Sequence, residues 1–181
     1  MGQVKEDILS NNRALVAYLQ ERGIPAQIAD KHCKQIHYSC RGNRYYAVGF
    51  ANESGGWELR NKYFKGCIAP KNISLRRIRD GPTTEVAVFE GFIDYLSALT
   101  LGIIQEADAI ILNSVINVDK AIRYLQEYRT IHCYLDNDVA GSTAMTKLVD
   151  KFNSNVIDHR DEYRDFNDLN DYLRAIHGVN H

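Results

Sequence analysis

The sequence predicts an α/β protein in which a parallel sheet with helices on both faces follows a smaller, basic α+β subdomain. Two observations carry this prediction. After Asp80-Gly81-Pro82, short apolar runs alternate with segments of helical spacing, which is typical of a parallel sheet. The charge changes there too, since residues 1–82 hold 14 Lys and Arg against 7 Asp and Glu, and residues 83–181 hold 8 against 16. We therefore expect two domains that meet at residue 82.

The first half is expected to form two helices and then a set of short strands. A cap at Ser10 or Asn11 and a stop at Gly23 predict the first helix, and Pro25 fits the first turn of the second. Runs rich in β-formers follow, separated by turns that contain glycine. The expected helices are 11–21 and 25–32, the expected strands are 35–40, 44–50, 57–60 and 73–78, and 61–72 is expected to be a loop.

The second half is expected to alternate strand and helix. Its strands are apolar runs rich in Val and Ile, and its first helix stops at Gly102. The expected strands are 85–89, 109–112, 131–135 and 155–157, and the expected helices are 92–101, 118–128, 143–152 and 167–176.

Acidic residues follow three of the four strands expected in this half. Glu90 comes after the first strand, Asp136 and Asp138 after the third, and the segment Arg164-Asp165-Phe166-Asn167-Asp168 beyond the fourth. Asp94 lies one helical turn after Glu90 and so on the same side. Because ligands of open α/β sheets bind beyond the carboxyl ends of the strands, these carboxylates are candidates for one shared site.

Carboxylates gathered at one edge repel each other, and a divalent cation removes that cost. Oxygen ligands with room for water suit Mg²⁺ or Mn²⁺ better than zinc, and leave positions open for phosphate oxygens. Two such ions can stabilise both the attacking and the leaving oxygen of a phosphoryl transfer. A simple helix N-cap is the better interpretation for Asp138 or Asp168 alone, but all these residues together favour a metal site. A basic half beside an acidic half suits a protein that holds a polyanion as well as cations.

The sequence gives no sign of a membrane or secreted protein. No apolar run approaches the roughly 18 residues of a membrane helix, and the N-terminus lacks the apolar stretch of a signal peptide. The four cysteines form no CxxC pair and are expected to be buried free thiols. We therefore expect a cytoplasmic protein without a membrane partner.

Three segments resemble the signatures of the Toprim family. FEGFIDYLSAL, which holds Glu90 and Asp94, is similar to the first signature as it occurs in bacterial replicative (DnaG-type) DNA primases. The segment 134–141, YLDNDVAG, resembles the second signature, with its pair of aspartates. The segment 164–168 resembles the third, in which a Lys usually stands where this chain has Arg164.

The likeness continues upstream and covers most of residues 14–175. YLQERGI at 18–24 resembles the start of a primase catalytic core, and 46–66 is similar to the basic, strand-rich segment that precedes Toprim there. GGWELRNKYFKG is similar to a segment of primase-like proteins carried by mobile elements in Bacteroides-type bacteria.

The resemblance implies a Toprim fold, which is a Rossmann-like parallel sheet, and a role for each signature residue. Glu90 is implied to be the acid/base or metal-facing residue. The implied ligands of Mg²⁺ or Mn²⁺ are Asp136 and Asp138, with Asp94 and Asp165 in support and Asp168 as either a ligand or a helix cap. The residues expected to hold template or nucleotide phosphates are Arg60, Lys62, Lys65 and Lys71.

The implied activity is magnesium-dependent nucleotidyl transfer on a DNA template, in the replication or mobilisation of DNA. The implied partners are the DNA template, nucleoside triphosphates, and a replicative helicase or a zinc-binding domain that this sequence does not contain. Because primases usually carry such a zinc-binding domain before the core, we expect the chain to be a fragment of a larger protein or a reduced version.

Two alternatives stay open. A Toprim nuclease needs only the acidic cluster, whereas a topoisomerase-type enzyme needs a tyrosine nucleophile whose context we do not identify. A non-catalytic nucleic-acid-binding module is the other alternative, although an idle acidic cluster would retain its repulsion without benefit. Aromatic residues of the basic half could stack on bases, but core packing is the commoner role on short strands. These residues are Tyr45, Tyr46, Trp57, Tyr63 and Phe64.

Overall fold

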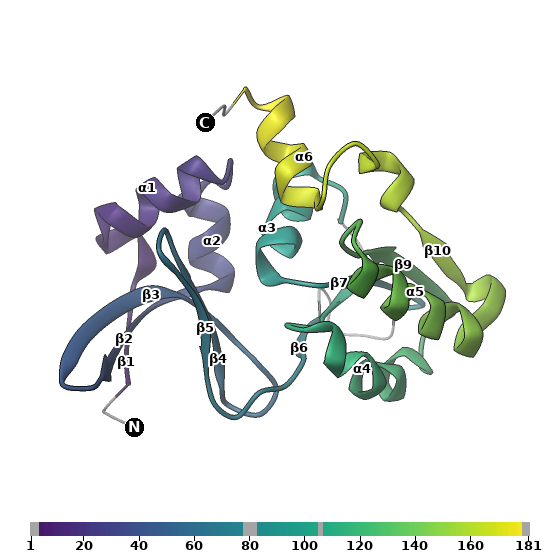
Figure 1. The fold of residues 1–181 in the computed structure, drawn as a ribbon, viewed down its shortest axis with the longest axis horizontal. Helices are drawn as coiled ribbons and strands as arrows, with labels where there is room; N and C mark the ends of the chain where they lie inside the picture. The colour runs from purple at the N-terminus through teal and green to yellow at the C-terminus, as the bar shows by residue number, and fades with distance from the viewer. Residues whose placement is uncertain (1–3, 78–82, 105–106, 179–181) are drawn as a thin grey trace.

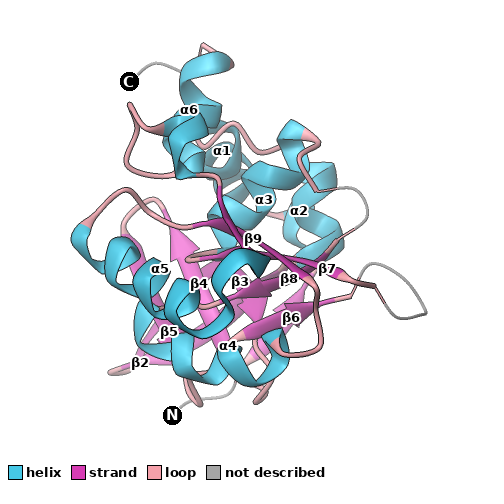
Figure 2. Cartoon of the chain, turned by 90° about the vertical axis from the view of Figure 1, so that its right-hand side faces the viewer, coloured by secondary structure: helices cyan, strands magenta, loops and turns pink. Residues whose placement is uncertain are grey.

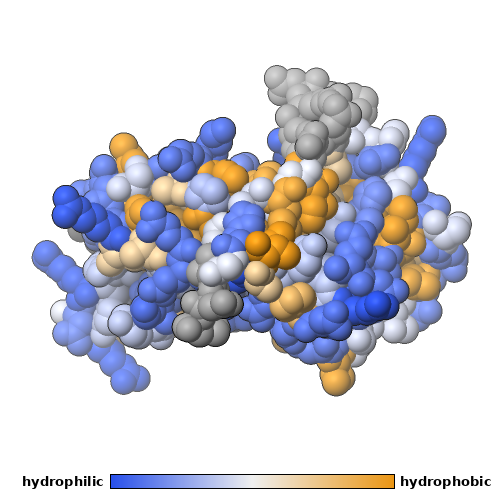
Figure 3. Space-filling view, turned by 90° about the horizontal axis from the view of Figure 1, so that it is seen from above, coloured by the Kyte–Doolittle hydropathy of each residue, from blue (hydrophilic) through white to orange (hydrophobic). Residues whose placement is uncertain are grey.

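The computed structural model describes residues 4–77, 83–104 and 107–178. Two five-stranded sheets lie next to each other, the first built from the N-terminal half and the second mainly from the C-terminal half (Figure 1). Seen from above, the surface is mostly hydrophilic and is interrupted by separate hydrophobic patches (Figure 3). Every helix in the described ranges is too short or too polar to cross a bilayer.

The first sheet is antiparallel and is covered on one face by two helices. Its strands, in spatial order, are β1 (Lys5–Asp7), β2 (Lys34–Cys40), β3 (Asn43–Ala51), β4 (Trp57–Asn61) and β5 (Phe64–Ile68). The helices are α1 (Arg13–Glu21) and α2 (Ala26–His32). Leu15 and Leu19 of α1 share a buried cluster with Val48 and Phe50 of β3, which fixes the helices on this face.

The cap of α1 is Asn12, so the expectation of Ser10 or Asn11 is wrong. Ser10 and Asn11 lie in a short 3-10 turn that precedes the helix. Asn12 has an extended backbone, and its Oδ1 accepts hydrogen bonds from the N–H groups of Ala14 (3.1 Å) and Leu15 (3.2 Å). These contacts satisfy donors that the first helical turn leaves free.

The expectation of a loop over 61–72 is also wrong, because β5 lies within it. The run Phe64–Ile68 pairs along β4, so that Leu59 faces Gly66. A side chain at Gly66 would overlap the ring of Phe64, which folds over the backbone there. The glycine that made this run look like a loop is therefore what lets the aromatic ring pack on the strand. The short edge strand β1 gave no signal, since its three residues are all charged.

The second sheet is the predicted parallel sheet. In spatial order its strands are β10 (Val156–Asp158), β9 (Thr130–Tyr134), β7 (Glu85–Phe89), β8 (Asp108–Ile111) and β6 (Ser74–Arg76). All neighbours are parallel except β6, which is antiparallel to β8. Each expected strand of this half is present: β7 has the expected ends, and the ends of the other three differ by one residue.

Helices cover both faces of this sheet, as the sequence predicts. Helices α3 and α6 lie on one face, whereas α4 and α5 lie on the other (Figure 2). Their bounds are α3 (Phe92–Leu101), α4 (Val118–Leu125), α5 (Val139–Phe152) and α6 (Leu169–Ile176). Helix α5 begins four residues before the expected start at 143, because Asp138 caps it.

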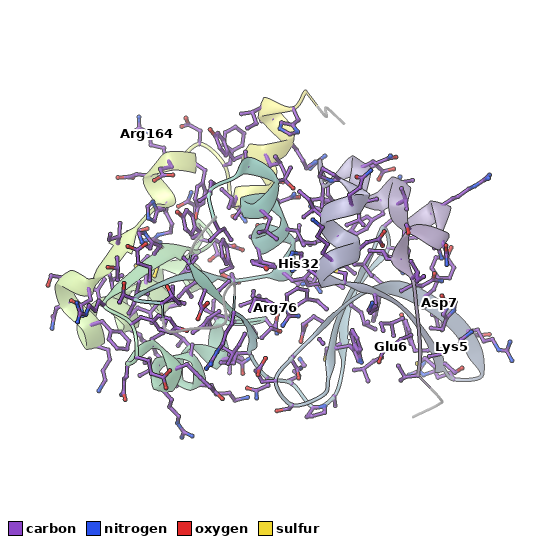
Figure 4. The ribbon with its side chains drawn as sticks, turned by 180° about the vertical axis from the view of Figure 1, so that it is seen from behind. Lys5, Glu6, Asp7, His32, Arg76 and Arg164 are labelled. Carbon is purple, nitrogen blue, oxygen red and sulfur yellow. The ribbon has the colours of Figure 1, made fainter. Side chains whose placement is uncertain are left out.

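The two halves share one core. The expected boundary at residue 82 falls outside the described residues, but β6 lies upstream of it and belongs to the second sheet. Arg76 of β6 donates a hydrogen bond to the carbonyl oxygen of Ala51 (3.1 Å) and lies over the ring of Phe50 at 4.0 Å. His32 lies near Arg76 at this junction (Figure 4) and is hydrogen-bonded through Nδ1 to the hydroxyl of Tyr95 (3.1 Å).

All four cysteines are free, but burial is found for only two of them. Cys33 and Cys133 are buried, and burial raises the pKa of each thiol to about 12. Cys67 is half-buried, and Cys40 is exposed because it stands at the end of the β2–β3 hairpin. The expectation of buried thiols is therefore wrong for Cys40.

Candidate active site

Carboxylates that follow two strands and carboxylates of two helices meet in one cleft of about 660 Å³. Glu90 directly follows β7, and Asp94 lies in the first turn of α3 behind it. Asp136 follows β9, and Asp168 caps α6. The parallel register of β7 and β9 brings their carboxyl ends to the same edge, which is why residues far apart in the chain line one cleft.

Burial is the main cause that raises the pKa of these four carboxyl groups. Mutual repulsion adds to it, mainly from Asp138 for Glu90 and from Asp168 for Asp94. The pKa of Asp136 rises to about 7, with Glu90 the largest source of repulsion. The site thus holds negative charge that only a cation or a proton can neutralise.

Both buried side-chain atoms that lack a hydrogen-bond partner in the described ranges belong to residues of this cleft. One is Oε2 of Glu90 and the other is Oδ1 of Asn113. The amide of Asn113 donates to the carbonyl of Asn72 and the hydroxyl of Ser74, both at 2.9 Å, so its oxygen is left free. Asn113 has a positive φ of 61°, in the left-handed region that asparagine adopts more readily than most residues. Such orphaned oxygens are costly unless a ligand meets them.

The donor set fits Mg²⁺ or Mn²⁺ held partly by a ligand. Within the described residues, no three His, Cys, Asp or Glu side chains are grouped closely enough to hold an ion by themselves. Magnesium usually takes only one or two carboxylates and completes its shell with water and phosphate oxygens. The free oxygen of Glu90 and the carboxylate of Asp136 match that requirement.

The remaining predicted carboxylates lie differently. Asp138 is exposed and caps α5, and its Oδ1 accepts a hydrogen bond from the N–H of Gly141 (2.7 Å). Asp168 lines the cleft and is also a cap, since it accepts from the N–H of Asp171 (2.7 Å). Asp165 is exposed and does not line the cleft. Arg164 points away from the body of the molecule (Figure 4), so this form of the third signature brings neither side chain into the cleft.

The opposite wall of the cleft is basic and comes from the first sheet, the loops that flank β5 and the end of α1. All four predicted phosphate-binding residues line it, together with Arg22 at the end of α1, which the sequence did not single out. Arg60 lies 5.7 Å from the centre of the Phe92 ring. Burial and neighbouring carboxylates raise the pKa of Glu90 and Asp136, and the charge of Lys65, which lines the same cleft, acts in the opposite direction. Lys62 forms an ion pair with Glu21, with 2.8 Å between its Nζ and Oε1 of the glutamate.

Asn137 fixes the loop that leads to Asp168. Its side-chain amide donates to the carbonyl oxygens of Phe166 (2.9 Å) and Tyr163 (3.1 Å). Its backbone N–H donates to the carbonyl oxygen of Asn167 (2.6 Å). The position of Asn137 between two aspartates in the sequence does not predict this role. Asn137, which lies between the two aspartates of the second signature, therefore holds the segment of the third signature by hydrogen bonds.

Asn137→Ala and Asn137→Asp are both expected to lower the free energy of unfolding by about 1–3 kcal/mol, because each leaves carbonyls without a donor. Both should also weaken Mg²⁺ binding, since Asp168 loses its fixed position. Urea unfolding and calorimetric titration would measure the two effects, with the exposed Asn155→Ala as control. Unchanged stability in Asn137→Asp would show that the amide is not a structural donor.

Gly141 allows α5 to begin directly against the end of β9. It is buried in the first turn of the helix, and a Cβ there would overlap the carbonyl oxygen of Asp136. Gly141→Ala would ordinarily favour a helix by about 1 kcal/mol. Here we expect a loss of about 1–3 kcal/mol and weaker Mg²⁺ binding, because the helix must move away from Asp136. Chemical denaturation would test this against the exposed Thr143→Ala, and a stabilised Gly141→Ala variant would contradict the close packing.

Comparisons with known proteins agree with this arrangement. Residues 87–173 match the family described as Toprim-like, and residues 4–69 match a domain of unknown function, DUF8464. A comparison with curated protein sequences finds no match. The Toprim-like match includes the segments that carry Glu90, Asp136 and Asp168.

Solved structures of primases share the fold over nearly the whole chain. The primase fragment of the bacteriophage T7 primase-helicase protein superimposes with a TM-score of 0.63 at 19% identity, over 93% of this chain and 71% of that one. The primase domains of T7 gp4, solved with the lagging-strand DNA polymerase and an RNA/DNA hybrid and dTTP, give 0.59 at 16% identity, over 97% and 91%.

The Aquifex aeolicus primase, solved as its zinc-binding and RNA polymerase domains, gives a TM-score of 0.60 at 15% identity. The match covers 94% of this chain but only 56% of that one. The TM-scores of these superpositions show a shared fold. Residues 87–173 therefore match a Toprim-like domain, and the chain shares its fold with these primase structures.

Proposed function

We propose that the chain is the catalytic core of a primase-like nucleotidyltransferase, which joins nucleotides on a DNA template with Mg²⁺ or Mn²⁺. The observation that carries this proposal is the cleft itself, in which an acidic edge faces a basic wall. A bound triphosphate needs the acidic edge and the basic wall together. Lys and Arg side chains hold its outer oxygens, and a metal ion joins it to the carboxylates.

Glu90 and Asp136 are the residues that would hold the metal, with Asp168 and Asp94 around them. The metal would supply positive charge between these carboxylates and the phosphates, and would stabilise the charge that develops during phosphoryl transfer. Asp138 adds negative charge from outside the cleft.

The residues of the basic wall would orient the nucleotide and the template. Lys65 lines the cleft with the carboxylates and its charge favours their ionised forms, which suits contact with the reacting phosphate. Arg60 and Arg22 line the same cleft and suit contacts to further phosphates. Burial raises the pKa of Glu90, and a carboxylate with a raised pKa is a stronger base for the proton of an attacking hydroxyl.

The proposed partners are DNA template and nucleoside triphosphates, with a zinc-binding domain or a helicase supplied from elsewhere. The similar structures support this, because one includes zinc-binding domains and another comes from a primase-helicase protein. We place this work in the cytoplasm, in the replication or mobilisation of DNA.

Primer synthesis tests the proposal. The chain would be incubated with single-stranded DNA, labelled nucleoside triphosphates and Mg²⁺ or Mn²⁺, beside Glu90→Gln. We expect short labelled products from the wild type and a loss of about a hundredfold in the variant, as for removal of one preorganised charged group. Metal-dependent cutting of plasmid DNA without any synthesis would overturn the proposal in favour of a Toprim nuclease.

A further inference from the structure

Three aromatic rings form a continuous row on the first sheet, which we call the aromatic ladder: Phe64, Tyr38 and Tyr45. The ring centres of Tyr38 and Tyr45 are 5.5 Å apart and nearly parallel, at 24°. Tyr38 and Phe64 are 6.1 Å apart at 31°. The outer two rings are open to solvent, since Phe64 is 42% and Tyr45 is 43% exposed. Large aromatic rings that are exposed side by side often mark a binding surface.

The ladder begins at the mouth of the candidate active site. Phe64 lines the cleft, and the neighbouring Tyr63, 91% exposed, lines it too. Tyr38 and Tyr45 stand directly opposite each other on β2 and β3, so they share a face of the sheet. The row therefore leads from the cleft along the β2–β3 hairpin.

The face that carries the ladder is not the face covered by α1 and α2. The buried residues under it are Ile36, Ala47, Leu59 and Ile68, which all belong to the first sheet. This small core supports the rings from below and keeps Tyr38 partly buried between the two exposed members. A rigid, supported ring is a better stacking surface than a free one, because it loses less entropy on binding.

The half of the chain that carries the ladder is basic, since residues 1–82 hold 14 Lys and Arg against 7 Asp and Glu. Arg41 is exposed at the turn of the hairpin that carries Tyr38 and Tyr45. Lys65, next to Phe64 on β5, points to the other face of the strand and lines the cleft where the ladder begins. Aromatic rings beside cations are a combination that binds single-stranded nucleic acid, since bases stack while the backbone is neutralised.

We infer that the aromatic ladder binds the bases of single-stranded DNA beside the cleft, and so guides the template strand to or from the acidic edge. This rests on the proposed function only in naming the strand as template. Stacking is tolerant of sequence, because every base has a π-face. A template must be copied whatever its sequence, and the ladder suits that need.

The chain contains its own matched control. Tyr46 follows Tyr45 on β3 and is equally exposed, at 43%, but neighbouring side chains of a strand point to opposite faces. Tyr46 pairs with His37, on the other side of the sheet from the ladder. Loss of either ring removes the same exposed area from the same strand.

Fluorescence anisotropy with a labelled oligo-dT of about 16 nucleotides, the largest site size known for single-strand-binding OB folds, would measure binding without nucleoside triphosphates. We expect Tyr45→Ala to raise Kd about tenfold, and Tyr45→Phe and Tyr46→Ala to stay within about twofold of the wild type. The dependence of Kd on salt should be unchanged in Tyr45→Ala, because no phosphate contact is lost. Arg41→Ala, at the turn of the hairpin, should reduce that slope by about one.

The outcomes distinguish a failure of the aromatic ladder from a failure of the proposed function. Equal weakening by Tyr45→Ala and Tyr46→Ala, in variants that unfold like the wild type, would overturn the ladder but leave the proposed primase function standing. No binding of oligo-dT by the wild type would overturn the ladder and the templated function together. Selective weakening by Tyr45→Ala without any primer synthesis would support the ladder and count against the proposed catalysis.

Discussion

Replacing Asp136 and Asp138 together by asparagine is expected to abolish Mg²⁺ binding and to lower primer synthesis by about two to three orders of magnitude. Asp136 faces the cleft, and Asp138 adds charge from the cap of α5. Asparagine has nearly the shape of aspartate and is itself a good N-cap, so the amide that replaces the Asp138 carboxylate can keep the hydrogen bond to Gly141. Loss of binding would then report lost charge rather than lost structure.

Isothermal titration with MgCl₂ and MnCl₂ would measure this, with Asp150→Asn on the exposed side of α5 as control. Asp165→Ala gives a sharper comparison, since the sequence placed Asp165 in the site but the structure leaves it outside the cleft. We expect Asp165→Ala to bind within about twofold of the wild type, because an exposed charge at a distance is screened. Equal binding by the wild type and the double variant would refute the metal site and favour a non-catalytic module.

The acidic edge was predictable because parallel strands end on the same side. Once the alternation after residue 82 indicated a parallel sheet, the residues after each strand had to meet. This was enough to bring Glu90, Asp136 and Asp168 together, and the structure has all three in one cleft. The spacing along the chain did not reveal that Asp165, three residues before Asp168, would face solvent.

The relation between the halves was not predictable from local pattern. The basic wall depends on β4 and β5 standing opposite the acidic edge, and that depends on packing between residues far apart in sequence. The buried Asn170 is an example, since its side-chain amide donates to the carbonyl of Arg22 (2.8 Å) and the hydroxyl of Ser97 (2.9 Å). Its backbone N–H donates to Asp94 (3.3 Å). An asparagine within a helix gives no sign of such contacts.

Asparagine at position 136 alone is expected to stabilise the metal-free protein at pH 8 and to cancel its response to Mg²⁺. The folded protein raises the pKa of Asp136 from 3.8 to about 7. A raised pKa means that the neutral carboxyl is favoured in the folded state. Its contribution to stability is present below about pH 4 and is lost as pH rises through 7. At pH 8 the wild type therefore holds an unfavourable charge.

The shift corresponds to a few kcal/mol at most, and partial solvent exposure reduces the expected gain of Asp136→Asn to about 1–2 kcal/mol. Mg²⁺ at about a hundred times its Kd should stabilise the wild type by about 2.7 kcal/mol at pH 8, and by much less at pH 5, where protons compete for the same carboxylates. Thermal unfolding followed by circular dichroism would measure these effects, with Asp150→Asn as control. A lower Tm for Asp136→Asn at pH 8 without metal would contradict the repulsion, and an undiminished Mg²⁺ effect in this variant would show that Asp136 is not a ligand.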